Sequence, residues 1–292
     1  MSRSGLVAVV GRPNVGKSTL VNALVGHKVS IVSDKPQTTR RGLHAVLTTE
    51  DAQAVFTDTP GFHKPRTELG VRLNDVVGNA VEGVDVILHV VDAASGIGRG
   101  DAFVYDRRVD PHACPKIAVV NKIDAIAKHG VVPQLAAAAE IGDYDEIVPV
   151  SAKAGKGIGM LRDLVLGLLP DGPALYPEET ISDQPFETRL AEMIREKALQ
   201  VTRQELPHSI TVMIEEVDID EGLTKVHASL IVERDSQKGI VIGKGGQTLR
   251  TIGSRAREEM ELALGTRIFL DLRVKVVKEW QRDPKALERL GF

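Results

Sequence analysis

The sequence predicts a chain of two domains, each of which mixes helices with strands. In the first 170 residues, short apolar runs typical of buried strands each end in a polar loop. Residues 169–185 are rich in Pro, Asp and Gly and show neither helical nor strand periodicity, which indicates a linker that we place at 171–185. From residue 186 to 292 the expected elements follow the order helix, strand, strand, helix, helix, strand.

Composition is compatible with this organisation and excludes several classes of protein. The chain has 292 residues, of which 42% are hydrophobic, enough for about two packed cores. Its one cysteine excludes an internal disulfide framework, and no apolar run reaches the roughly 18 residues that span a bilayer. These features favour the cytoplasm. The net charge of -3 means that any nucleic-acid surface has to be local.

A glycine-rich loop follows the first expected strand, Leu6–Val10. The stretch GRPNVGKS, Gly11–Ser18, has the spacing G-x-x-x-x-G-K-S of a phosphate-binding loop. Its glycines let backbone amides face an anion, Lys17 reaches the outer phosphates, and Ser18 offers a hydroxyl to Mg²⁺. The apolar pattern that continues from Thr19 predicts a helix whose N-terminus adds positive potential. This loop alone does not distinguish ATP from GTP.

The stretch VFTDTPG contains the second candidate loop. A short strand, Val55–Thr57, ends at Asp58, where a carboxylate can hold Mg²⁺ directly or through water. The amide of Gly61 can face the γ-phosphate. Taken alone, the same residues are equally compatible with an ordinary turn.

The stretch IAVVNKID predicts which base is bound. After the strand Ile117–Val120, Asp124 can accept two hydrogen bonds from guanine, whereas adenine offers no such pair of donors. Asn121 is expected to contact the base edge and neighbouring loops, and the stem of Lys122 to lie along the purine. The alternative is a helix cap, since Asn and Asp both cap well.

Two weaker signals complete the set. The strand Ile147–Val150 is followed by Ser151-Ala152-Lys153, where the Ala152 amide could reach guanine O6. The polar loop SIVSDKPQTTRR has no periodicity, and either Thr39 or Thr38 could place its hydroxyl on Mg²⁺ and its amide on the γ-phosphate.

In this order, the five motifs resemble those of Ras-like GTPases. The resemblance implies a P-loop NTPase fold, an α/β doubly wound and mostly parallel sheet, with ligands at the carboxyl ends of the strands. It implies GTP contacts by Gly11, Asn14, Val15, Gly16, Lys17, Ser18, Thr19, Asp58, Gly61, Asn121, Lys122, Asp124, Ser151, Ala152 and Lys153. It implies Mg²⁺ ligands at Ser18, Thr39 and Asp58, and catalytic roles for Lys17, Thr39, Asp58 and Gly61.

The hydrolytic residues depart from the Ras pattern at one position. Ras has a water-orienting glutamine after the DTAG-type glycine, but this chain has Phe62, which resembles GTPases with a hydrophobic residue there. Slow intrinsic turnover is the predicted consequence. His63 is a weak candidate for a substitute base. Asn14 is the residue through which related GTPases respond to K⁺, so K⁺ is a further cofactor implied by resemblance.

A second glycine-rich stretch, KGIVIGKGGQ, lies between the two expected helices of the second domain. It is not a second phosphate loop, because only three residues separate Gly239 from Gly243 and no Ser or Thr follows Lys244. Gly243-Lys244-Gly245-Gly246 instead fits the GxxG loop of a type II KH domain, a smaller α+β fold that binds single-stranded RNA. The expected RNA contacts are Ile242, Gly243, Lys244, Gly245, Gly246 and Arg250.

Local charge supports an RNA partner for this domain. Residues 234–278 contain ten basic and five acidic side chains, although the whole chain is acidic. Cations near a GxxG loop would contact phosphates and make binding salt-dependent. For Arg255, Arg257 and Arg267 individually, simple solvation of a charged helix face is the favoured interpretation.

A Ras-like GTPase domain followed by a type II KH domain resembles the Era family of bacterial GTPases. The shared stretches include GRPNVGKSTLVN, KPQTTR, DTPGFHKP, NKID, SAK, the YPEE linker and GIVIGKGG with LRTIG. The resemblance implies binding of 16S rRNA near its 3′ end, action in assembly of the small (30S) ribosomal subunit, a monomer, and peripheral membrane association at the inner face.

The resulting hypothesis is a switch in which GTP orders the Thr39 loop and the loop Asp58–Phe62, and hydrolysis releases them. One rival is a constitutive RNA-binding module whose nucleotide domain only stabilises the fold. Another is a metabolic P-loop kinase, against which the NKID stretch argues.

Overall fold

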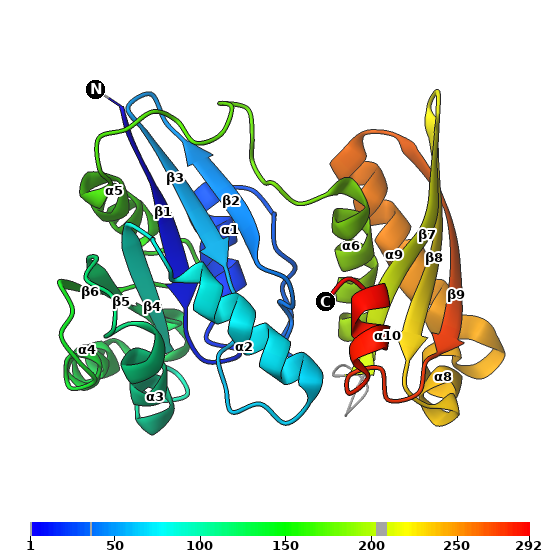
Figure 1. Cartoon of the computed structure of the whole chain (residues 1–292), viewed down its shortest axis with the longest axis horizontal. Helices are drawn as coiled ribbons and strands as arrows, with labels where there is room; N and C mark the ends of the chain where they lie inside the picture. Colours follow the sequence, from blue (N-terminus) through cyan, green and yellow to red (C-terminus); the bar gives the residue numbers. More distant parts are fainter. Residues whose placement is uncertain (1, 36, 203–208) are drawn as a thin grey trace. The chain divides into compact units, whose positions relative to one another are not determined.

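The computed structural model describes residues 2–35, 37–202 and 209–292. These residues divide into two compact units. The first comprises residues 1–32, 39–66 and 70–183, and the second comprises 33–38, 67–69 and 184–292. A six-stranded sheet lies in the first unit and a three-stranded sheet in the second (Figure 1). Among the described residues, no helix has the length and apolar character that crossing a membrane requires.

The six-stranded sheet has the strand order β2-β3-β1-β4-β5-β6. Its strands are β1 Arg3–Val10, β2 Leu43–Thr48, β3 Ala52–Asp58, β4 Val86–Asp92, β5 Lys116–Asn121 and β6 Glu146–Pro149. β2 pairs antiparallel with β3, whereas all other neighbours are parallel. β1, β3, β4 and β5 are almost wholly buried, as expected when helices cover both faces, whereas the edge strand β6 is only partly buried.

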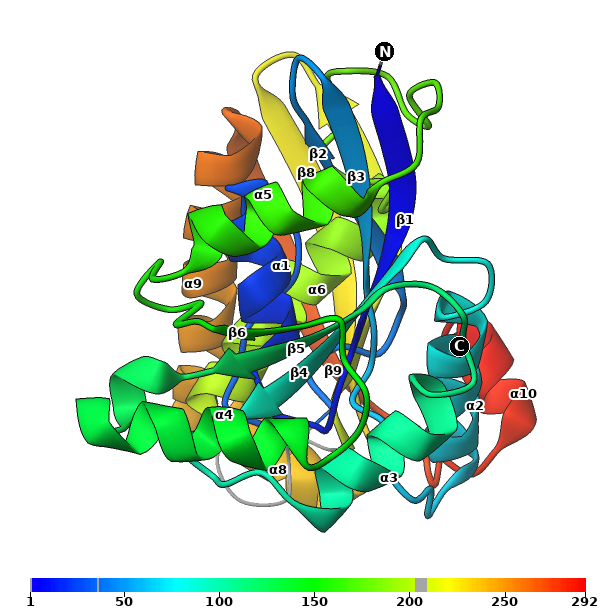
Figure 2. The same cartoon turned by 90° about the vertical axis from the view of Figure 1, so that its left-hand side faces the viewer.

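Helices cover both faces of this sheet (Figure 2). They are α1 Lys17–Val25, α2 Glu68–Ala80, α3 Arg99–Arg108, α4 Val131–Ala139 and α5 Ile158–Leu168. One core joins α1 and α5 to the strands through Leu20, Leu24 and Leu161. The opposite face packs against α2, α3 and α4 through side chains that include Val77, Val104 and Ala138. The predicted doubly wound α/β fold is confirmed.

The strands expected from sequence are all present, and none of their ends differs from the observed end by more than three residues. They were expected at Leu6–Val10, Val55–Thr57, Val86–Val91, Ile117–Val120 and Ile147–Val150. β2 was not predicted. It follows directly on the polar threonine loop and alternates incompletely, because only its second and last residues are partly exposed. Pairing with β3 at the edge of the sheet, rather than a strong local pattern, makes this segment a strand.

The segment expected to be a linker is tied to the edge of the first sheet. Ala45 forms an isolated antiparallel bridge with Ser182, and the Val46 amide donates to the Ile181 carbonyl at 2.9 Å. The side-chain oxygen of Gln53 accepts hydrogen bonds from the amides of residues 175 and 176 at 2.7 and 2.9 Å. Composition correctly indicated a segment without helix or strand, but could not show that it is anchored over residues 175–183.

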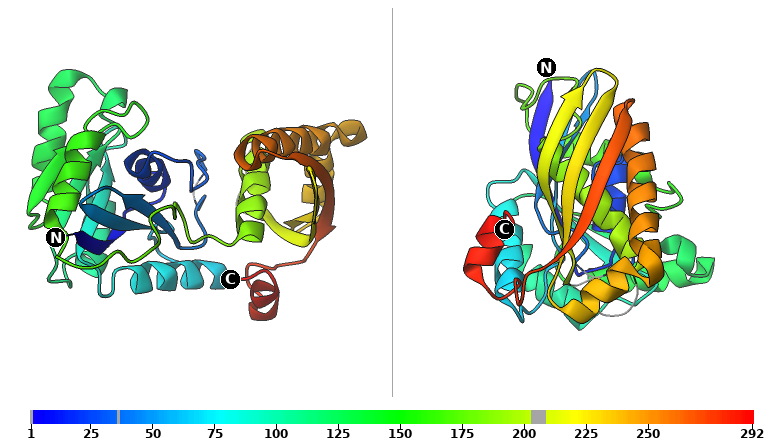
Figure 3. Two further views of the ribbon diagram at one scale, coloured as in Figure 1. Left: turned by 90° about the horizontal axis from the view of Figure 1, so that it is seen from above. Right: turned by 90° about the vertical axis from the view of Figure 1, so that its right-hand side faces the viewer.

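The second unit has the element order that the sequence predicts. Its elements are α6 Phe186–Val201, β7 Thr211–Asp220, β8 Leu223–Val232, α8 Asp235–Ile242, α9 Gln247–Leu264 and β9 Arg267–Val276, followed by α10 Pro284–Arg289. β7 and β8 are antiparallel, β8 and β9 are parallel, and α6 and α9 lie against one face (Figure 3). The expected end of α6 near Pro207 lies outside the described residues, and the helix ends at Val201.

Two features of the sequence of this unit acquire a structural explanation. Lys197, which interrupts the apolar face of α6, pairs with Glu196 at 3.1 Å and with Glu259 of α9, so its charge is compensated where it is largely buried. Trp280 is fully buried and donates its indole N–H to the Ser209 carbonyl at 3.1 Å. It therefore anchors the C-terminal segment on this unit.

Candidate functional site

The glycine-rich loop Gly11–Gly16 joins the end of β1 to the start of α1. A Cβ at Gly11 would overlap the Val90 carbonyl oxygen, and one at Gly16, whose φ is +98°, would overlap the side-chain amide of Asn121. Glycine is therefore required at both positions by close packing. Asn14 also has a left-handed backbone, with φ +64°. The helix begins at Lys17, so free amides of its first turn point toward the loop's anion site.

Lys17 is buried inside this loop. Its Nζ donates to the carbonyl oxygens of Gly11 and Arg12 at 3.1 and 3.0 Å. Burial lowers the pKa of Lys17 to about 8, and the nearby Asp58 carboxylate opposes that shift. An anion bound in the loop would stabilise the charged amine in the same way.

Three oxygen-bearing side chains meet beside Lys17. The hydroxyls of Ser18 and Thr39 are 2.7 Å apart, and Thr39 donates to Asp58 Oδ2 at 3.4 Å. Asp58 is fully buried, which raises its pKa, and its Oδ1 is buried without a hydrogen-bond partner. Mg²⁺ prefers hard oxygen ligands. The Asp58 carboxylate, which has one oxygen without a partner, and the two hydroxyls supply such ligands.

The hydroxyls of the two candidate threonines point in different directions. The hydroxyl of Thr38 donates to the carbonyl of Lys35 at 2.7 Å, whereas that of Thr39 faces Ser18 and Asp58. Of the two, only the Thr39 hydroxyl lies beside the Ser18 hydroxyl and the Asp58 carboxylate.

The loop after β3 packs closely on the glycine-rich loop. A Cβ at Gly61 would lie 2.6 Å from Pro13 Cα, and the Phe62 amide donates to the Gly11 carbonyl at 3.2 Å. The Phe62 ring is buried and belongs to the core formed with α2 and α3. Nδ1 of His63 lies 2.9 Å from the Gly61 carbonyl oxygen. Phe62 thus directs a ring into the core and offers no hydrogen bond to a water molecule.

The residues expected to contact the base come together at the ends of β5 and β6. Asn121 donates to the Val15 carbonyl at 2.9 Å and accepts from the Ala152 amide at 3.0 Å, which ties three loops together. The Ser151 hydroxyl donates to Asp124 Oδ1 at 2.5 Å and so orients that exposed carboxylate. The Ala152 amide, expected at guanine O6, donates to Asn121 in this structure. Lys153 is exposed beside them.

Asp92, at the end of β4, is a residue of this site that the sequence analysis missed. Lys122 Nζ donates to Asp92 Oδ2 at 2.8 Å and to the Asn14 carbonyl at 2.6 Å, so the lysine bridges two loops. Burial alone would raise the pKa of Asp92, but hydrogen bonds from Lys122 and the Ala94 amide outweigh it and lower the pKa. The signal was available, because Asp92 ends an apolar strand as Asp58 does.

A second candidate site surrounds the GxxG loop between α8 and α9. Gly243, Gly245 and Gly246 have φ of +73°, +58° and +78°, and Lys244 is exposed between them. A Cβ at Gly245 or Gly246 would meet nothing within 4 Å, whereas one at Gly243 would overlap the Thr248 hydroxyl. Gly245 and Gly246 therefore leave the backbone accessible, and Gly243 permits the turn into α9.

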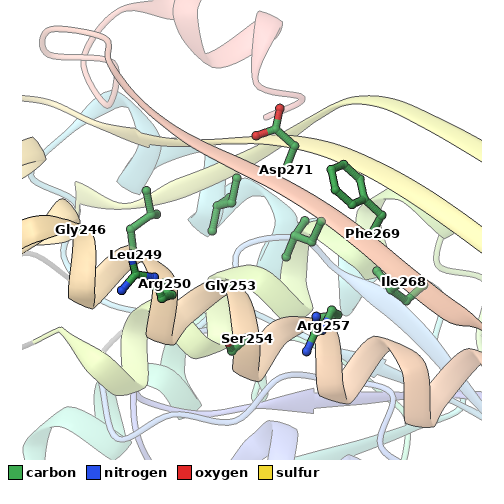
Figure 4. Close-up of a pocket in the computed structure, with 11 residues that line it drawn as sticks. Gly246, Leu249, Arg250, Gly253, Ser254, Arg257, Ile268, Phe269 and Asp271 are labelled. Carbon is green, nitrogen blue, oxygen red and sulfur yellow. The ribbon is translucent and has the colours of Figure 1, made fainter.

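A groove continues from this loop between α9 and β9 (Figure 4). Its lining residues are Gly246, Leu249, Arg250, Gly253, Ser254 and Arg257 of the helix side, and Ile268, Phe269, Leu270, Asp271 and Leu272 of the strand. Arg250 and Arg257 are exposed on the α9 wall, whereas the Phe269 ring, on the face of β9 away from α9, packs against His227. Cations beside an apolar floor suit a chain of phosphates and bases.

This groove extends the predicted set of residues. Arg250, which the sequence analysis assigns to RNA, lines it. Arg257, for which plain solvation was the favoured interpretation, also lines it, two helical turns from Arg250. Phe269 and Ser254 were not singled out. The sequence does not show that α9 and the first half of β9 leave a groove between them.

Fold and sites together define a P-loop nucleotide-binding protein with a KH-type second unit, and comparison with known proteins narrows the class. Residues 6–122 match the family described as "50S ribosome-binding GTPase", and residues 205–281 match the KH domain family. The chain is 52% identical to GTPase Era of Mycobacterium tuberculosis H37Rv over 295 residues, which cover 99% of this chain and 98% of that protein. It is also 52% identical to GTPase Era of Mycolicibacterium smegmatis, with 99% of each chain covered. The chain belongs to the GTPase Era family.

Two solved structures resemble the whole chain. One is Era in complex with MgGDPNP and nucleotides 1506–1542 of 16S ribosomal RNA, at 40% identity and a TM-score of 0.96, covering 100% of this chain and 99% of that one. The other is a variant of Aquifex aeolicus Era bound to GDP and AlF4⁻, at 41% identity and a TM-score of 0.95, with 99% of both chains covered.

Proposed function

We propose that this chain is a GTP-hydrolysing switch that binds 16S rRNA near its 3′ end through its KH domain and acts in assembly of the 30S subunit. The main support for the proposal is that one chain contains both a phosphate-loop site and a basic groove beside a GxxG loop. Lys17, Ser18, Thr39 and Asp58 converge beside a phosphate loop, and a basic groove adjoins a GxxG loop. The likeness to Era bound to MgGDPNP and RNA supports both assignments.

We assign the phosphates to the loop Gly11–Ser18 and to Thr19 at the start of α1. Lys17 would hold the outer phosphates, since its buried amine already turns into the loop. Ser18, Thr39 and Asp58 would hold Mg²⁺, which when bound neutralises the charge that develops on the phosphates. The Gly61 amide would face the γ-phosphate.

Guanine selectivity is assigned to Asp124. Its carboxylate is exposed but oriented by Ser151, so it can accept hydrogen bonds from a purine that offers paired donors. Asn121 would act mainly by joining Val15 and Ala152, with Lys122 held across the site by Asp92. Lys153, which follows Ser151 and Ala152, would lie beside the same base.

Hydrolysis is expected to be slow without a stimulating partner. Catalysis of phosphoryl transfer rests on positioning and on electrostatic stabilisation, and a glutamine usually orients the water. The buried Phe62 ring supplies no hydrogen bond for that purpose. The partner that completes the site would belong to the assembling subunit.

RNA would enter the groove along α9 and β9. Gly245 and Gly246 leave the backbone open to the sugar-phosphate chain, and Lys244 and Arg250 supply positive charge. Ile242 and Gly243 close α8 and set the direction of the loop.

The decisive experiment is RNA binding by the full chain with each nucleotide. A labelled single-stranded fragment of the 16S 3′ end should bind tighter than a scrambled fragment, and with different affinity in the presence of a GTP analogue and of GDP. Equal affinities with both nucleotides would favour the constitutive RNA-binding module. Crosslinking in cell extract should recover 16S 3′-end fragments, and recovery of unrelated RNA would contradict the proposal.

Four further assignments stay predictions. They are the cytoplasmic location, the monomeric state, peripheral membrane association and the K⁺ response through Asn14. The K⁺ assignment is tested by hydrolysis in sodium and in potassium, since identical rates would remove it.

A further inference from the structure

Helix α3 makes two contacts with the loops that we assign to the phosphates. In the first, Arg12 Nε donates to Asp101 Oδ1 at 2.7 Å, and Arg12 Nη2 donates to the Gly96 carbonyl at 3.1 Å. Asp101 is fully buried, and its Oδ2 accepts from the Gly98 amide at 3.0 Å. Both carboxylate oxygens of Asp101 accept hydrogen bonds, so this is a buried, fully hydrogen-bonded carboxylate rather than a surface ion pair.

The pair acts on the phosphate loop through the backbone of Arg12. Arg12 is the second residue of that loop, and its carbonyl oxygen accepts the hydrogen bond from Lys17 Nζ. Fixing the guanidinium therefore fixes the carbonyl that orients the phosphate-binding amine. The fit is close, because a Cβ at Gly100 in the first turn of α3 would lie 2.7 Å from Arg12 Cδ.

The second contact holds the loop after β3. The Phe62 ring stacks on Phe103 of α3, with centroids 5.4 Å apart and planes inclined by 17°. The guanidinium of Arg108, at the end of α3, lies 4.6 Å from the Phe62 ring centroid. Arg108 also donates to the Asn74 carbonyl at 3.4 Å, and Asn74 donates to the His63 carbonyl at 2.8 Å.

We infer that α3 is a positioning element for GTP hydrolysis. The Arg12–Asp101 pair sets the phosphate loop, and the contacts of Phe103 and Arg108 with Phe62 set the Gly61 loop. The aromatic ring that replaces a water-orienting glutamine thus serves to seat its loop on α3. The inference rests on the proposed assignment of Gly11–Ser18 to the phosphates.

The two contacts predict different kinetic effects. The phosphate loop would touch phosphates that GDP and GTP share, so disturbing Arg12 should weaken both nucleotides and slow hydrolysis. Gly61 is assigned to the γ-phosphate alone, so disturbing Arg108 should lower kcat and spare GDP affinity. A merely structural role would lower the unfolding temperature without producing this division.

The first test is Gly100→Ala in the full chain, with Gly159→Ala as the matched control. The new methyl group would displace Arg12, whereas at Gly159 of α5 a Cβ meets nothing within 4 Å. Since small misplacements in active sites cost up to about 100-fold, Gly100→Ala should lower GDP affinity and single-turnover hydrolysis by roughly 10-fold. Gly159→Ala should match the unchanged protein. Equal behaviour of the two folded variants would overturn the role of the pair.

The second test compares Arg108→Met with Arg108→Lys. Loss of the cation over the ring should lower kcat by roughly 3-fold with unchanged GDP affinity, and lysine should restore part of it. Thermal unfolding confirms that both variants are folded at the assay temperature. If kcat and GDP affinity fall together, or if neither falls, the proposed role of Arg108 is contradicted.

Lys17→Ala separates failure of this inference from failure of the proposed site. Loss of nucleotide binding in Lys17→Ala, with Gly100→Ala and Arg108→Met behaving as the unchanged protein, would overturn only the inference about α3. Unchanged binding in Lys17→Ala would overturn the phosphate-loop assignment itself.

Discussion

The nucleotide site and the RNA groove would both bind phosphates, but they are built in opposite ways. Lys17 is 6% exposed and packed among backbone carbonyls, whereas Lys244 stands in solvent. A Cβ would overlap neighbouring atoms at Gly11 and Gly16, but would meet open space at Gly245 and Gly246. The first site is a closed arrangement of buried directional contacts, and the second is an open surface.

This difference sets the size of the effects that substitutions should have. Buried charge interactions act in a low dielectric and are individually strong, whereas exposed cations are screened by water and salt. Single changes in the nucleotide site should therefore be large and specific, and single changes in the groove smaller and dependent on ionic strength. Four experiments test this expected difference between the two sites.

The largest expected effect is at the base. Asp124→Asn removes the charged acceptor, and two charge-assisted hydrogen bonds at about 1.5 to 3 kcal/mol each imply a loss of GDP affinity of roughly 100-fold or more. Calorimetric titration with GDP and ADP measures it. ADP bound by the unchanged protein as tightly as GDP would contradict the assignment of Asp124.

The next effect is in the GxxG loop. Gly245→Asp places a negative charge where we expect an RNA phosphate and should lower affinity for the 16S fragment by roughly 10-fold at low salt. Gly222→Asp is the matched control, because Gly222 in the β7–β8 turn also has a positive φ and open space around it. Both variants carry the same backbone strain. A similar loss in both would show that strain, rather than charge at the loop, weakens binding.

A third experiment uses pH. Burial lowers the pKa of Lys17 to about 8, so the nucleotide-free amine loses its proton as pH rises through 8, and GDP affinity should fall, by at most about 10-fold per pH unit. The unfolded chain keeps that proton until about pH 10.5. The unfolded state therefore binds more protons between pH 8 and 10.5, and this lysine's contribution to the free energy of unfolding should rise across that window.

Titrations of GDP at constant Mg²⁺ between pH 7 and 9.5 check the binding, and denaturant unfolding without nucleotide checks the stability. Binding that does not change across that range would contradict the proposed contact between Lys17 and the phosphates.

The smallest expected effect is at the groove wall. Arg250→Ala should weaken RNA binding a few-fold and reduce the slope of log affinity against log salt by roughly 0.7, the value for one phosphate contact on a single strand. Arg255→Ala is the control, since Arg255 is exposed on the same helix but does not line the groove. Equal slopes for the two variants would remove Arg250 from the interface.

Motifs of the nucleotide site could be recognised from sequence because each combines backbone requirements with a fixed spacing. Asp58 ends β3, and Lys17 and Ser18 open the helix that follows the adjacent parallel strand β1, so the three side chains meet at the same edge of the sheet. Thr39 could not be separated from Thr38 in this way, since adjacent residues of an irregular loop have no period that fixes which one faces inward. Asp92 showed the same pattern as Asp58 but lies outside the five motifs.

The sequence by itself determined the order of elements, the phosphate and base motifs and the glycine loop of the second unit. These are local properties, governed by backbone freedom and by which side chains must leave water. Only the tertiary structure decided that β2 pairs at the sheet edge, that Arg12 meets Asp101 and that Phe62 is held by Phe103 and Arg108. Those contacts join residues far apart in the chain, and close packing selects them only after the elements have come together.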